Sequence, residues 1–120
     1  MASHSRPKTL KKGEVLMKEG DPSTSLYWLQ KGQMSVVRQG EEEGQEILLG
    51  FVYQGEVVGE MSFLDSSVRS ATVRAESDCD LIEIPSENFE KIFNSQPKWM
   101  QILIKTLVER LRRTNARIQV

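Results

Sequence analysis

Residues 59–73 read G-E-M-S-F-L-D-S-S-V-R-S-A-T-V, and the rest of the chain is arranged around them. Gly59 lacks a Cβ, so the backbone there can approach a ligand closely. The Arg69 guanidinium is a planar fork that suits a phosphate, and backbone N–H groups in a turn or at a helix start bind anions. The Glu60 carboxylate accepts hydrogen bonds from a sugar hydroxyl. An acid for a ribose and an arginine for a phosphate on one loop indicate a nucleotide pocket. Taken as residues alone, a surface hairpin with an ordinary Glu and Arg fits equally well.

Short apolar runs separated by turn residues surround this loop. The clearest turns are E-G-D-P-S at 19–23 and the acidic hairpin tip E-E-E-G at 41–44. The pattern predicts about eight short strands, at Leu10 and at 15–17, 26–29, 34–38, 47–52, 57–58, 71–75 and 81–84. Strands at such close spacing favour a sandwich or barrel of jelly-roll type.

Helical periodicity replaces the strand pattern after residue 84. Phe89, Ile92 and Phe93 predict a short helix that begins at Pro85 or Ser86 and ends near 94–95. Pro97 opens a longer helix towards Val120, whose apolar residues recur in coiled-coil steps of four and three: Met100, Ile104, Leu107, Leu111 and Ile118. Four more apolar residues are expected to widen this stripe towards the strands: Trp99, Ile102, Leu103 and Val108. The helix at 97–120 therefore predicts a homodimer, in preference to packing on its own domain alone.

The runs G-E-M-S and R-S-A-T-V, at this spacing, resemble the phosphate-binding cassette of cyclic-nucleotide-binding domains. These modules occur in bacterial catabolite activator proteins, protein kinase A regulatory subunits and cyclic-nucleotide-gated channels. The run V-L-M-K-E-G-D-P-S-T-S-L-Y-W-L-Q-K-G at 15–32 is similar to the opening of their β-roll, and the resemblance covers nearly the whole chain.

The resemblance implies a mainly β fold with C-terminal helices: a double-stranded β-helix (jelly roll) of about eight strands, a short cassette helix, then a short and a long α-helix. The expected divisions are a flexible N-terminal arm at 1–8, a β-roll at 9–95 with its cassette at 59–73, and the long helix at 96–120.

The resemblance also implies roles for single residues. Arg69 would hold the cyclic phosphate, with the Ser70 hydroxyl and the backbone N–H groups of Ser70 and Ala71 completing its shell. Glu60 would accept from the ribose 2′-hydroxyl, Gly59 and Met61 would lie against the ribose by backbone contact, and Ser62 would also belong to the ligand-binding residues. Ser70 rather than Thr after the arginine favours cAMP over cGMP as the ligand. Thr114 and Asn115 fall where related helices touch adenine across the dimer. The sequence is equally compatible with Thr114 being only a polar residue that interrupts the apolar stripe of the helix.

Composition limits the other classes of function. The chain has 120 residues, a net charge of −1, one cysteine and one histidine, which fits one domain without an internal disulfide. Cys79, between Asp78 and Asp80, is interpreted as structural. We expect no metal or other cofactor, no catalysis, no membrane or nucleic-acid binding by this chain, and a cytoplasmic location.

Two alternatives stay open beside the regulatory module. One is a degenerate domain that only dimerises, although Glu60 and Arg69 are both present. The other is the sensor part of a longer transcription regulator, because neither Gly nor Pro marks an end to the last helix.

Overall fold

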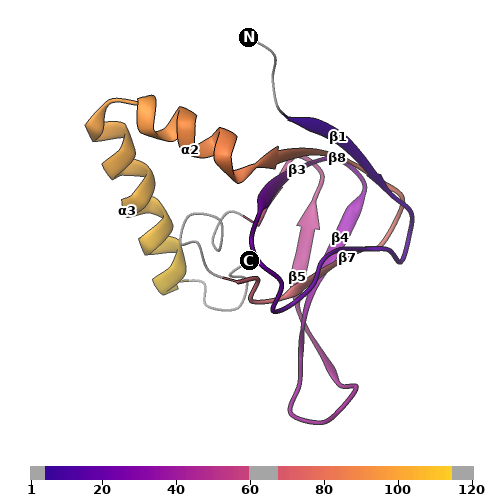
Figure 1. Cartoon of the computed structure of the whole chain (residues 1–120). Coiled ribbons are helices and arrows are strands. Elements are labelled where there is room, and N and C mark those ends of the chain that lie inside the picture. The colour runs from indigo at the N-terminus through magenta and orange to yellow at the C-terminus, as the bar shows by residue number, and fades with distance from the viewer. Residues whose placement is uncertain (1–4, 60–67, 115–120) are drawn as a thin grey trace.

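Two four-stranded antiparallel sheets build the body of the protein (Figure 1). The computed structural model describes residues 5–59 and 68–114, and side chains as far as residue 110. One sheet has the order β1-β8-β3-β6 and the other β2-β7-β4-β5. The strands are β1 (Arg6–Leu10), β2 (Val15–Met17), β3 (Ser25–Lys31), β4 (Gln33–Gln39), β5 (Glu46–Tyr53), β6 (Val57–Val58), β7 (Thr72–Ala75) and β8 (Cys79–Pro85).

The core lies between the two sheets. Leu29, Met34, Val36, Val73 and Leu81 are almost completely buried and come from strands of both sheets. Burying each such side chain contributes about 1.5–3 kcal/mol. The jelly-roll class and all eight predicted strands are confirmed. The apolar residues of each run supply the side chains that the strand directs towards the core.

The imperfect alternation of β4 has a structural cause. Four of its seven residues, Met34 to Val37, are buried in succession, and the register with β5 shifts between Val36 and Val37. The bulge breaks the period of two at Val37, whereas Ser35 precedes it and is hydrogen-bonded to Glu76 on the other face. Beyond it the β4–β5 hairpin projects from the roll, with the acidic residues 41–43 exposed near its tip (Figure 1).

The expected flexible arm at 1–8 is wrong for residues 6–8. Arg6, Pro7 and Lys8 lie in β1 and pair with Glu83, Ile82 and Leu81 of β8. Pro7 concealed this strand in the sequence because proline has no N–H for a ladder. It is tolerated here because β1 is an edge strand.

Helices α2 (Ser86–Ser95) and α3 (Lys98–Thr114) follow the last strand and lie to one side of the roll (Figure 1). The short helix is confirmed, with Pro85 as its N-cap residue. The corner between the helices is held by the Gln101 side-chain amide, which donates to the Gln96 carbonyl at 2.9 Å. Lys105 Nζ also lies 5.8 Å from the centre of the Phe93 ring. No helix in the described ranges is long and apolar enough to cross a membrane.

The apolar residues of α3 form two rows, and their expected assignment is partly wrong. Met100, Ile104 and Val108 are half-buried. The exposed residues are Trp99, Ile102, Leu103 and Leu107. Three of these four, at 99, 102 and 103, were expected to face the strands. The spacing of four that separates 100, 104 and 108 repeats in 99, 103 and 107, so sequence period alone does not say which row is covered.

Cys79 is buried within the core. Its sulfur lies 3.2 Å from the Ser77 carbonyl oxygen and 3.5 Å from that of Gln33. Burial raises the pKa of the thiol, and the charge of Asp78 raises it further. A neutral, enclosed thiol fits the structural role inferred from the sequence.

Candidate functional site

Arg69 and Gly59 meet at the base of the predicted cassette. The Arg69 side chain is buried, with the residue only 3% exposed. Its Nη1 donates to the Gly59 carbonyl at 3.0 Å, and its Nη2 donates to the Ser25 carbonyl at the start of β3. One guanidinium therefore joins two chain segments that lie 10 and 44 residues away in sequence.

The contact between Arg69 and the backbone at position 59 requires a glycine there. Its φ is +92°, a conformation that residues with a side chain rarely adopt. A Cβ at this position would lie 2.7 Å from Arg69 Nη1 and 3.3 Å from Met17 Cε. Backbone and guanidinium can meet here only because the side chain is absent.

The backbone of Arg69 is held by the turn between β2 and β3. The Arg69 N–H donates to the Asp21 carbonyl at 2.8 Å, and the Gly20 N–H donates to the Arg69 carbonyl at 2.8 Å. Pro22 and Val68 form an isolated antiparallel bridge beside them. The turn predicted at 19–23 thus fixes where Arg69 enters the interior.

A polar cluster that the sequence did not reveal continues from Arg69 along β3 and β8. The Ser25 hydroxyl donates to Glu83 Oε2 at 2.9 Å, and the Tyr27 hydroxyl donates to the same oxygen at 3.4 Å. Burial raises the pKa of the Tyr27 hydroxyl, Glu83 raises it further, and the positive charge of Arg69 opposes the rise. Glu83 also lies 3.4 Å from Arg6 Nη2 at the edge of the sheet.

One sequence signal could have found Glu83. It alternates with the buried Leu81 along β8, which places its carboxylate on the core face. A charged residue at an inward position of a strand needs a partner. Ser25 and Tyr27 gave no comparable signal because their role depends on the register of β3 against β8.

The structure brings together only part of the predicted site. Gly59, Arg69 and Ala71 are buried, and Ser70 is exposed beside Arg69. Glu60, Met61, Ser62 and Asn115 lie outside the described residues, as does the region of the predicted cassette helix. Thr114 is the last residue of α3, and its side chain also lies outside the description.

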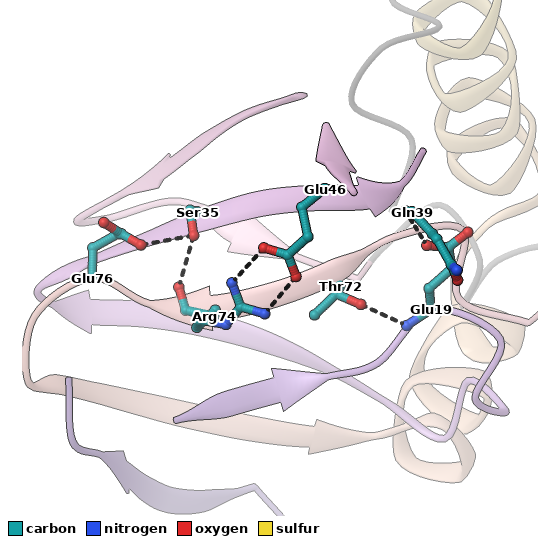
Figure 2. Close-up of polar contacts among 7 residues, drawn as sticks. All are labelled: Glu19, Ser35, Gln39, Glu46, Thr72, Arg74 and Glu76. Atoms are coloured by element: carbon teal, nitrogen blue, oxygen red, sulfur yellow. Dashed lines mark hydrogen bonds and ion pairs between the residues drawn. The ribbon is translucent and has the colours of Figure 1, made fainter. Parts of the chain in front are cut away.

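An open depression of about 770 Å³ lies elsewhere on the protein. Thr72 and Arg74 line it and alternate with the buried Val73 and Ala75, so it lies on the outer face of the sheet β2-β7-β4-β5. Figure 2 shows its polar contacts, including the paired bonds from Arg74 to Glu46 at 3.0 and 2.8 Å. Neither Gly59 nor Arg69 lines it. The guanidinium that lines this depression, that of Arg74, is paired with the Glu46 carboxylate.

The model of the family described as "Cyclic nucleotide-binding domain" matches residues 7–96. The chain belongs to this family. Its β-roll and α2 make up the matched segment of the cyclic nucleotide-binding domain. No cluster of three or more His, Cys, Asp or Glu that could hold a metal ion occurs within residues 5–59 and 68–114.

Similar proteins include the cAMP-activated global transcriptional regulator CRP of Salmonella typhimurium, 30% identical over 105 residues. The match covers 87% of this chain and 50% of that regulator, so this cyclic nucleotide-binding domain spans about half the length of its relative. Among solved structures, the cGMP-bound form of the EAL enzyme Bd1971 has a TM-score of 0.78 and 30% identity, covering 90% of this chain and 28% of that one. The catabolite activator protein of Thermus thermophilus has a TM-score of 0.77 and 28% identity, covering 93% and 52%.

Proposed function

We propose that this chain is a regulatory module that binds a cyclic nucleotide, cAMP in preference to cGMP, and that Arg69 receives the cyclic phosphate. The observation that carries the proposal is the buried Arg69 guanidinium, held against Gly59 at the base of the cassette. A guanidinium held in this way can offer a phosphate its positive charge and further N–H donors. The proposal assigns the chain no catalytic step.

The neighbours of Arg69 support a division of labour in the site. Two carbonyl oxygens accept from its two terminal nitrogens and so fix the plane of the guanidinium. Ser70 and Ala71 follow at once, so their N–H groups and the Ser70 hydroxyl would complete the phosphate shell. Glu60 would accept from the ribose 2′-hydroxyl, and Thr114 and Asn115 would contact the base.

The ligands bound by similar proteins support the class of ligand. The EAL enzyme Bd1971 has both cAMP-bound and cGMP-bound structures, and CRP is described as cAMP-activated. The preference for cAMP rests on Ser70, since a threonine at this position is the feature linked with cGMP in the family.

The helices would carry the signal. Ligand phosphate would bind the cassette, the corner at 94–97 would transmit the change to α3, and α3 would pair with α3 of a second copy. Coupling of this kind is usually worth about 1–3 kcal/mol and acts equally in both directions.

Isothermal titration calorimetry with cAMP tests the site. Arg69→Ala should weaken binding at least about a hundredfold, because it leaves the phosphate charge without its partner. Arg74→Ala is the matched control, since Arg74 is paired with Glu46 on the outer face of the sheet and should leave the affinity unchanged.

Thermal melting of both ligand-free variants would show whether they are folded. Equal affinities for wild type and Arg69→Ala would refute the assignment of Arg69. A folded wild type that binds neither cAMP nor cGMP would instead favour the degenerate, dimerising module.

A further inference from the structure

The hydrogen bonds of Ser25 lead from Arg69 to the neighbouring strand β8. Ser25 is 3% exposed and begins β3. Its carbonyl accepts from Arg69 Nη2, while its hydroxyl donates to Glu83 Oε2 at 2.9 Å. The same residue therefore touches the guanidinium with its backbone and the carboxylate with its side chain.

The register of the two strands explains why Glu83 is the partner. Tyr27 is opposite Glu83 and Ser25 is opposite Pro85, so Ser25 and Tyr27 reach the same carboxylate from β3. Both hydroxyls converge on Oε2, and Arg6 approaches Oε1 at 3.4 Å. A carboxylate with several partners is held in one orientation, and so it holds the residues that donate to it.

We propose that Ser25 and Glu83 are positioning residues for cyclic nucleotide binding, and that their hydrogen bond fixes the Ser25 carbonyl against which Arg69 is oriented. The proposal rests on the function proposed above. A guanidinium offers a phosphate its donors in one plane, so a rotated acceptor carbonyl would turn this plane away from the ligand. Neither Ser25 nor Glu83 needs to touch the nucleotide.

The chain offers a closely matched control. Ser35 is 4% exposed, and its hydroxyl donates to Glu76 Oε2, also at 2.9 Å (Figure 2). This bond joins β4 to the residue after β7, on the other sheet. Ser35→Ala removes the same kind of hydrogen bond from a similarly buried serine, but its carbonyl is not an acceptor of Arg69 in the contacts described here.

Calorimetry with cAMP on the whole chain tests the proposal. Ser25→Ala and Glu83→Leu should each weaken binding about three- to tenfold, the range expected when one hydrogen bond is lost, since leucine has no acceptor for the Ser25 hydroxyl. The double variant should be no weaker than the weaker single one, because both changes break the same bond. Ser35→Ala should bind within about twofold of wild type, even where its melting midpoint falls as far as that of Ser25→Ala.

Each outcome decides something different. Ser25→Ala and Glu83→Leu with wild-type affinity overturn the proposal, and so does a Ser35→Ala that weakens binding equally. Glu83→Leu removes the acceptor and leaves a side chain of similar size, so it supplies the test where Ser25→Ala does not fold. A wild type that binds neither cAMP nor cGMP refutes the proposed function itself, which separates that failure from a failure of the positioning role.

Discussion

Gly59 shows how a single residue sets the geometry of the site. Replacing it with alanine strains the backbone at φ +92° by about 1–2 kcal/mol and sets a Cβ 2.7 Å from Arg69 Nη1. We therefore expect Gly59→Ala to lower the free energy of unfolding by at least this amount and to weaken cAMP binding about tenfold or more. Urea unfolding and calorimetry measure the two effects.

Gly55 supplies the control at the same scale. Its φ is +95°, but nothing lies within 4 Å of a Cβ placed there. Gly55→Ala should suffer only the backbone strain and should keep its affinity for cAMP. If both variants bound cAMP like the wild type, the close approach of Gly59 to Arg69 would have no part in binding.

Some residues of the site could be predicted because they belong to a local motif, and others could not because they depend on strand register. Gly59 and Arg69 were predictable because both belong to one continuous motif, and their chemistry is visible in the letters. Ser25 and Glu83 lie 58 residues apart and meet only through the register of β3 and β8. No local pattern contains such a pairing, so the polar cluster appears only in the folded chain.

At the scale of the element, α3 carries an exposed apolar row that the proposed dimer would cover. Trp99, Leu103 and Leu107 recur every four residues and are 63%, 47% and 53% exposed. We expect the wild type to have twice the 13.7 kDa mass of one chain in light scattering. Leu107→Lys should lower the measured mass towards that of one chain, because the lysine charge would be buried between the two α3 helices.

Leu48 of β5 is the matched control for this element. It is 55% exposed, about as much as Leu107, but lies on a strand of the roll. Leu48→Lys should leave the mass unchanged. A wild type that runs at 13.7 kDa at micromolar concentrations would contradict dimerisation through α3.

The predictability of the elements follows from their period. The strands and α2 were predictable because turn residues and a change of period mark their limits. The role of each face of α3 could not be predicted, because two apolar rows with the same spacing run along the helix. Only packing in the folded chain distinguishes the half-buried row of Met100, Ile104 and Val108 from the exposed row. The strand at 6–8 was missed because Pro7 is compatible with a strand only at a sheet edge.

At the scale of the whole molecule, a ligand that binds only the folded state must raise the melting temperature of the two sheets together. At a hundred times its dissociation constant, cAMP adds about 2.7 kcal/mol, which for a chain of this length corresponds to a rise of about 10 °C. We expect a smaller rise with cGMP at the same concentration, and almost none with cAMP for Arg69→Ala. A rise with cGMP equal to or larger than that with cAMP would contradict the preference inferred from Ser70 and leave the class of ligand intact.

The same melting experiment with 5′-AMP tests whether one buried guanidinium sets the charge that the site accepts. A phosphate monoester carries close to two negative charges at neutral pH, whereas a cyclic phosphate carries one. With Arg69 as the compensating cation, the second charge of 5′-AMP would enter the buried site without a partner, which is strongly unfavourable. We therefore expect 5′-AMP to raise the melting temperature much less than cAMP at equal concentration. An equal rise would mean that the phosphate stays in solvent, away from Arg69.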